Sequence, residues 1–173
     1  MSGITGKGAS RFDISNVPVS IDWVHHQIHL GNLFSFSNIS AVSANHVLEF
    51  LVSTGASMPH LRPILQSDDA CRLDLYEGTT TSNDGTPGTI YNRNRNSART
   101  LTATVFVTPT LTADGTLIHS EQLQTAKGSY GGKDEWDREF ILKPNTKYLL
   151  RFTAGNAAIS LNVILDMYDN IYT

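Results

Sequence analysis

Residues Ala70–Glu77 read ACRLDLYE, with apolar and polar side chains alternating along the stretch. Successive side chains of a β-strand point to opposite faces of its sheet, so this period of two predicts a strand buried on one face. The next segment, 78–89, reads GTTTSNDGTPGT. Its glycines, proline, asparagine and aspartate favour turns, and we predict a loop there.

The same arrangement of a short apolar stretch followed by turn residues recurs on both sides of this segment. The predicted strands are 21–30, 33–36, 47–53, 61–65, 70–77, 101–107, 117–123, 139–142, 148–153 and 159–167. Pro59 and Pro63 confine the 61–65 strand to a sheet edge, because proline cannot donate a ladder hydrogen bond. Segment 43–51 (SANHVLEFL) is the one rival helical candidate.

About eight to ten short strands at fairly regular spacing predict an all-β fold, an antiparallel sandwich of two sheets. The pattern alone leaves sandwich, jelly roll and barrel open. A chain of 173 residues is long enough for one domain with a sizeable core. Residues 1–20 are rich in Gly, Ser and Thr, and we interpret them as an extended N-terminal arm. Residues 21–173 form the predicted β-sandwich domain.

The overall charge restricts the classes of partner. A net charge of −3 argues against a general nucleic-acid binder, which needs excess positive potential. The chain has no apolar run of membrane-spanning length, and its first residues lack the apolar region of a signal peptide. We therefore expect a soluble protein that is not secreted by the usual route and has neither membrane nor nucleic acid as a direct partner.

An arginine-rich stretch, 90–100, reads IYNRNRNSART. If it is a strand, its alternation places Arg93 and Arg95 on one face and the asparagines on the other. In an acidic chain such arginines pair with carboxylates more often than with phosphates. We predict that both are buried in ion pairs, with Glu77, Asp74 or acids of another subunit as partners. Binding of these arginines to nucleic acid is the weaker alternative.

Three histidines lie in the segment 25–29, HHQIH. Cupin-type jelly-roll enzymes bind metal through histidines two apart on a strand, but position 27 is glutamine here. On a strand, His25 and His29 share a face at a separation of about 13 Å, too far for one metal ion. We therefore expect partly buried, hydrogen-bonded histidines rather than a metal site.

The aromatic residues Trp23, Trp136 and Tyr130 are compatible with a stacking platform for carbohydrate, although core or interface packing is their more frequent use. The sequence has no carboxylate pair with the spacing of an acid/base couple and no nucleophile–histidine signature. We accordingly expect no catalytic residue, metal or cofactor. The residues selected as structural or interface candidates are Trp23, His25, His29, Glu77, Arg93, Arg95, Tyr130 and Trp136.

Several stretches together match a known family. They are IHLG at 28–31, LYEGT at 75–79, NRNR at 92–95 followed by Ser97, DGT at 114–116, EFILKPNTKYLLR at 139–151 and DMY at 166–168. Over residues 21–169 the sequence resembles the capsid decoration, or cement, proteins of tailed bacteriophages, small virion proteins with a jelly-roll body.

This resemblance implies a jelly-roll fold and a non-enzymatic shell protein, usually a homotrimer. Such a protein is made in the host cytoplasm, binds the major capsid protein on the outside of the virion and stabilises the head. The family has no catalytic residues. We further expect residues 1–20 to contact the major capsid protein or an adjacent subunit.

Two other functions stay open. One is a different virion role, in the tail, baseplate or fibre attachment, or a carbohydrate-binding module that uses Trp136 and Tyr130. The other, less favoured, is a cupin-like metalloenzyme that uses the histidine segment.

Overall fold

The computed structural model of the chain describes residues 11–12, 18–19, 23–123 and 139–169. Within these residues the one helix is α1 (Trp23–Leu30). The strands are β1 (Arg11–Phe12), β2 (Pro18–Val19), β3 (Leu33–Val42), β4 (Val47–Ser53), β5 (His60–Ser67), β6 (Cys71–Glu77), β7 (Thr80–Asn83), β8 (Thr86–Pro87), β9 (Tyr91–Asn92), β10 (Thr104–Val107), β11 (Thr110–Ala113), β12 (Thr116–Leu123), β13 (Phe140–Ile141), β14 (Lys147–Ala154) and β15 (Ile159–Tyr168).

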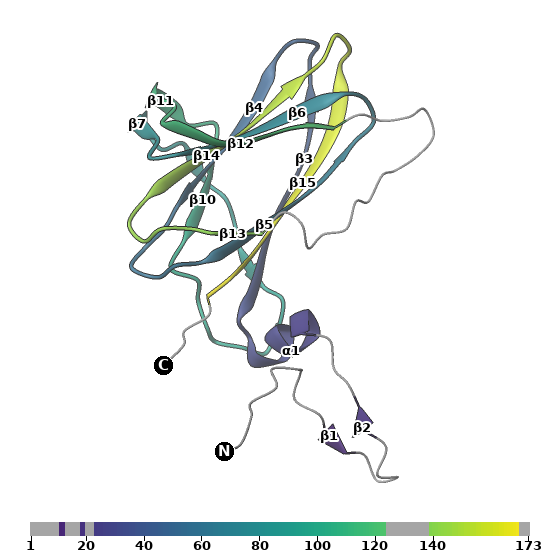
Figure 1. Ribbon diagram of the computed structural model, residues 1–173, viewed down its shortest axis with the longest axis vertical. Coiled ribbons are helices and arrows are strands. Elements are labelled where there is room, and N and C mark those ends of the chain that lie inside the picture. Colours follow the sequence, from purple (N-terminus) through teal and green to yellow (C-terminus); the bar gives the residue numbers. More distant parts are fainter. Residues whose placement is uncertain (1–10, 13–17, 20–22, 124–138, 170–173) are drawn as a thin grey trace, which may run out of the picture.

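Two antiparallel sheets pack face to face (Figure 1). One has the strand order β12-β6-β14-β4-β10-β8, and the other has the order β13-β5-β15-β3-β9. The chain passes from one sheet to the other between β3, β4, β5 and β6, and again between β12, β13, β14 and β15. The first and last of these eight strands, β3 and β15, are neighbours in the five-stranded sheet, and the second and seventh, β4 and β14, are neighbours in the six-stranded sheet. This is the strand order of a jelly roll. The predicted all-β sandwich of jelly-roll type is confirmed.

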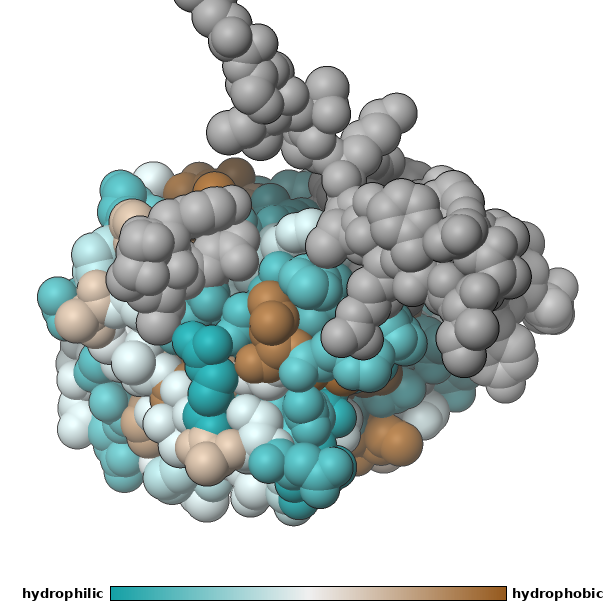
Figure 2. Space-filling view, turned by 90° about the horizontal axis from the view of Figure 1, so that it is seen from below, coloured by the Kyte–Doolittle hydropathy of each residue, from teal (hydrophilic) through white to brown (hydrophobic). Residues whose placement is uncertain are grey.

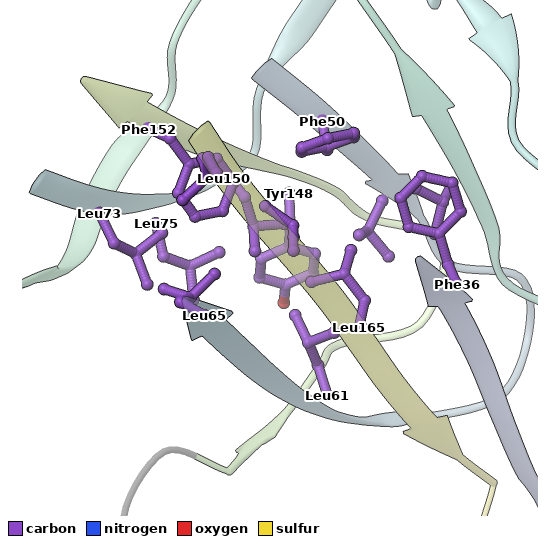
Figure 3. Packing of buried hydrophobic residues seen from close by; sticks show 14 of the residues in the cluster. Phe36, Phe50, Leu61, Leu65, Leu73, Leu75, Tyr148, Leu150, Phe152 and Leu165 are labelled. Carbon is purple, nitrogen blue, oxygen red and sulfur yellow. The ribbon is translucent and has the colours of Figure 1, made fainter. Parts of the chain in front are cut away.

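The core fills the space between the two sheets. Aromatic rings of Phe36, Phe50 and Phe152 meet edge to face, with centroids 5.5 and 5.9 Å apart. Figure 3 shows these rings among leucines that come from both sheets. The stretch ACRLDLYE behaves as predicted, because its cysteine and two leucines are at most 1% exposed and face this core. Each such buried side chain contributes about 1.5–3 kcal/mol to folding.

One of the predicted strands needs correction. Residues Trp23–Leu30, predicted as part of a strand, form the helix α1. It ends in a Schellman motif, in which Gly31 (φ 71°) donates to the Ile28 carbonyl and Asn32 donates to the Gln27 carbonyl. The alternative helix at 43–51 does not form, because residues 47–51 belong to the strand β4.

The sheet-edge prediction for the strand with Pro63 is only partly met, because β5 is the second strand of its sheet and β13 is the edge. β5 pairs along its whole length with β15, and on its other side β13 pairs only with His60 and Leu61. Pro63 lies beyond that short pairing with β13 and is the register partner of Leu165 on β15, so on the β13 side no described strand pairs with it.

The segment 78–89, predicted as a loop, contains the strands β7 and β8. β6 pairs with β12, β7 with β11 and β8 with β10, so a two-stranded ribbon continues through all three pairs. The first and last pairs belong to the six-stranded sheet, on opposite sides of β14 and β4. The middle pair therefore crosses over those two strands, and we call residues 78–85 and 108–115 the arch. β7 and β11 lie together at the upper left of Figure 1.

Backbone geometry at the corners explains why this segment looks like a loop in sequence. Gly78 and Gly115 form one corner with φ values of 75° and 92°, and Gly85 and Thr108 form the other with 95° and 54°. A Cβ added to Gly115 would lie 2.4 Å from the Glu77 carbonyl oxygen. Turn residues therefore mark the bends of the ribbon rather than an absence of strands.

The arch covers an apolar patch on the outer face of the six-stranded sheet. Leu51 and Leu149 are cross-strand partners on β4 and β14 that alternate with the core residues, yet each is 0% exposed. Two ion pairs flank them. Lys147 Nζ lies 2.6 Å from Asp84 Oδ1, and the Arg151 guanidinium binds both oxygens of Asp114 at 2.7 and 2.8 Å. Both carboxylates belong to the arch, so these pairs hold it over the leucines.

Candidate functional site

One end of the sandwich combines α1, the loop 92–99 and the ends of β3 and β15. Side chains from the loop bind the end of the helix, because Asn92 Nδ2 donates to the Gly31 carbonyl at 2.9 Å and Asn94 Nδ2 donates to the His29 carbonyl at 3.1 Å. The backbone N–H of Arg93 donates to the Leu33 carbonyl at 2.9 Å. The arginine-rich loop is therefore fixed to the helix and to β3 at several points.

The alternation of Asn and Arg has a different cause from the one predicted. β9 includes only Tyr91 and Asn92 of this stretch, so Arg93 and Arg95 do not lie on a strand. The side chain of Asn92 accepts from the backbone N–H of Asn94, and that of Asn94 accepts from the N–H of Asn96, at 2.9 and 3.1 Å. These are consecutive Asx turns. The period of two therefore comes from asparagine capping the backbone two residues ahead.

Arg93 forms an ion pair, but with a partner that the sequence did not indicate. Its Nη1 lies 3.1 Å from Oδ2 of Asp166, which is 3% exposed and also accepts a hydrogen bond from Ser35. Arg62, itself 2% exposed, is the register partner of Asp166 on β5. Because β9 joins the five-stranded sheet, Arg93 meets residues of β15 rather than Asp74 of the other sheet.

The predicted burial of both arginines is wrong. The Arg93 side chain is 43% exposed, and Arg95 is exposed with its guanidinium carbon 5.1 Å from the ring centroid of Tyr91. Tyr91 is 56% exposed, and Arg99 in the same loop is exposed as well. The loop thus presents three guanidinium groups to solvent on a rigid backbone. Figure 2, which looks at the molecule from this end, shows mainly hydrophilic side chains with a few hydrophobic ones among them.

Trp23 lies at the same end and packs against a polar aromatic cluster. Its ring meets that of Tyr168 edge-on at 4.9 Å, and Tyr168 stacks on His60 at 4.4 Å. Glu139 accepts a hydrogen bond from the Tyr168 hydroxyl and pairs with His60 Nδ1 at 2.6 Å. Trp23 is half-buried and joins the helix to the sandwich, which is the packing role rather than an open stacking platform.

His25 and His29 lie on the helix α1 and not on a strand as predicted. They lie one turn apart on α1, are exposed rather than partly buried, and their Nε2 atoms are 2.9 Å from each other. The separation of about 13 Å expected for a strand does not apply, because i and i+4 side chains of a helix are neighbours.

Glu77 is not part of this end. It accepts hydrogen bonds from Lys143 Nζ at 2.6 Å and from the buried Tyr148 hydroxyl at 2.9 Å, and these donors lower its pKa. Its role is to tie β6 to β14 and to the turn that precedes β14.

Three parts of the sequence-based site lie outside the described residues: Tyr130, Trp136 and most of the segment 1–20. Of the last, the described pieces Arg11–Phe12 and Pro18–Val19 pair as β1 and β2. In the part of the chain that the structure describes, no group of three or more His, Cys, Asp or Glu side chains is placed to hold a metal ion. No described helix is long and apolar enough to cross a membrane.

Guanidinium groups and an aromatic ring are exposed at this end, and the ionisable groups behind them are engaged with one another. The chain's cysteine, Cys71, is 0% exposed in the core, where burial raises the pKa of its thiol to about 11, so it is a weak nucleophile. Sequence reasoning missed Asp166 and Ser35, which have no local motif. It could have found the Asx turns, because Asn at every second position is their signature.

Comparison with protein-family models and with curated proteins finds no match for this chain.

Proposed function

We propose that the protein is a structural component of a virion, a decoration protein that binds the major capsid protein of a tailed-phage head and stabilises the shell. The observation that carries this proposal is the loop 92–99, in which exposed arginines are held on a rigid jelly-roll body by hydrogen bonds to the end of α1. The sequence resemblance supports it, since the jelly-roll body which that resemblance implied is the fold observed.

The loop suits a surface that docks on acidic side chains. Arginine binds carboxylates in a planar, two-point geometry, and Arg95 and Arg99 are both exposed. Because the Asx turns fix the backbone before binding, less conformational entropy is lost on contact. A shell repeats each contact many times, so an interface that is weak for one copy becomes strong for an assembly.

The remaining parts of the proposal follow the family resemblance. The protein forms a homotrimer on the outside of the capsid, and residues 1–20 contact the major capsid protein or a neighbouring subunit. It acts without catalysis or cofactor.

Binding to heads tests the proposal. Purified protein is mixed with phage heads that lack it, and bound protein is measured after sedimentation. The wild type is expected to sediment with the heads, and Arg95→Gln/Arg99→Gln to bind at least roughly tenfold more weakly through loss of charged contacts. Each single variant, Arg95→Gln and Arg99→Gln, is compared with Arg72→Gln, which removes the same charge from an exposed arginine that pairs with Asp74 at the far end of the sandwich, where β6 begins.

Labelling of intact particles with antibody supplies the second readout. Label on the head supports the proposal, and label confined to the tail or baseplate overturns it. Wild-type protein that stays in the supernatant also overturns it. Equal binding by the double variant would show that the loop is not the contact surface.

A further inference from the structure

Two histidines on the exposed side of α1 face each other across one helical turn. The Nε2 atoms of His25 and His29 are 2.9 Å apart, and the ring centroids are 4.6 Å apart with the planes tilted by 58°. Both residues are exposed to solvent. The ring nitrogens that lie farthest from the backbone therefore converge on one point outside the helix.

We propose that His25 and His29 form a chelating site for a divalent late transition metal, with Cu²⁺ and Ni²⁺ preferred. An imidazole nitrogen binds such ions at about 2.0–2.1 Å, and at that length a 2.9 Å spacing corresponds to a nitrogen–metal–nitrogen angle of about 90°. This is the angle between adjacent ligands of a square-planar or tetragonal ion, the geometry that Cu²⁺ and Ni²⁺ favour. The two nitrogens already have the spacing that the ion requires.

The helix end that carries the pair is held in place before any metal binds. The Schellman motif at Gly31 closes the last turn, and Asn94 donates to the carbonyl of His29 itself. A chelate of this kind needs the helical conformation, since the same residues on a strand would be about 13 Å apart. The C-terminal turn of a helix also favours a positive charge, which suits a bound cation.

The pair supplies two ligands. Within the described residues no third His, Cys, Asp or Glu completes a cluster, so the remaining positions of the ion are filled by water or by groups of another molecule. Such a site is open at the surface and is distinct from the closed sites of structural zinc. The inference does not depend on the virion role proposed above.

Titration of the purified full-length chain with CuCl₂ tests the site, with heat of binding and the EPR spectrum of Cu²⁺ as readouts. The wild type is expected to bind one ion per chain with nitrogen ligands. His25→Gln and His29→Gln should each weaken this binding by at least roughly tenfold, since each leaves a single imidazole. Glutamine is at least as good a helix former as histidine, so α1 is retained, and circular dichroism checks this.

His26→Gln is the matched control, because His26 is adjacent in sequence but lies on another side of the helix. It should bind Cu²⁺ like the wild type. A second readout is thermal unfolding: Cu²⁺ and Ni²⁺ should raise the Tm of the wild type and of His26→Gln more than that of the His25→Gln/His29→Gln variant, because the site exists only in the folded chain. Mg²⁺, which prefers oxygen ligands, should have no effect.

Two results would overturn the proposal. One is wild-type affinity for Cu²⁺ no higher than that of the double variant. The other is a loss of affinity in His26→Gln as large as in His25→Gln.

Discussion

Arg93 and Asp166 connect the loop after β9 to the last strand of the sandwich, with 3.1 Å between Nη1 and Oδ2. The Asp166 side chain is 5% exposed while the Arg93 side chain is 43% exposed, so it is the aspartate whose charge is removed from water. The two residues are 73 positions apart in sequence. Arg95, two residues further along the loop, makes a cation–π contact with Tyr91 at the surface instead.

The two arginines should therefore differ in their effect on stability. Arg93→Gln removes a charged donor from a buried carboxylate, and we expect it to lower the free energy of unfolding by about 1–3 kcal/mol. Arg95→Gln removes an exposed contact and should cost under about 1 kcal/mol. Urea unfolding of both variants measures this, and equal losses would show that the Asp166 pair is not what distinguishes them.

The corner glycines of the arch provide a matched pair of substitutions. Gly78 and Gly115 both have positive φ, but a Cβ on Gly78 meets no atom within 4 Å, whereas one on Gly115 meets the Glu77 carbonyl oxygen at 2.4 Å. Gly78→Ala should cost about 1–2 kcal/mol, the strain of the left-handed conformation. Gly115→Ala should cost clearly more, because the opposite strand must move as well. Thermal unfolding that gives the same Tm for both would contradict the corner geometry.

The leucines beneath the arch should behave as core residues although they lie outside the main core. Leu149→Ala is expected to lower stability by about 2–5 kcal/mol, the range for fully buried leucines. Leu117 is the control, because it lies on the same face of the sheet, opposite Tyr76, but is 50% exposed. Leu117→Ala should change stability by less than about 1 kcal/mol. Comparable losses in the two variants would mean that the arch does not cover Leu149.

Acid should weaken the attachment of the arch. Hydrogen bonds from Lys147 and Arg151 lower the pKa values of Asp84 and Asp114, respectively, below their values in the unfolded chain. A lowered folded-state pKa contributes stability that is fully present above the unfolded value, near 4, and is lost as pH falls through the folded value. The Tm should therefore vary little between about pH 7 and 5 and fall below about pH 4.

Asp114→Asn tests the assignment of this acid effect to the arch. The variant should have a lower Tm than the wild type at neutral pH and a shallower decline in acid, because the titrating carboxylate has been removed. A decline as steep as that of the wild type would assign the acid sensitivity to other carboxylates.

The fold class followed from the sequence because β-strand periodicity is local. Alternation in ACRLDLYE placed its apolar residues correctly, whereas Pro63 lies on the second strand of its sheet, which the short edge strand β13 covers only at His60 and Leu61. The jelly-roll strand order depends on contacts between distant segments, and the sequence reached it only through family resemblance. The helix α1 was missed because its histidines and β-branched residues are as common in strands, and the deciding interactions are the hydrogen bonds at Gly31 and Asn32.

The site was harder to predict than the fold. Asp166 and Arg62 read as ordinary strand residues, and only the pairing of β15 with β5 brings them together under Arg93. The three histidines at 25–29 stand out in the sequence, but the predicted separation of His25 and His29 applies to a strand, and they lie on the helix α1. A change from strand to helix alters an i to i+4 distance far more than any side-chain movement can.

The arch also constrains the order in which the protein can assemble. Residues 78–115 leave the ribosome before β14, yet β14 occupies the space beneath them, between β6 and β4. An arch that closed early would oblige a later strand to insert under it, and native chains avoid such threading. We therefore expect the ribbon to close last, after the carboxyl-terminal strands have joined the sheets, so that a nascent chain halted before residue 147 carries its arch open.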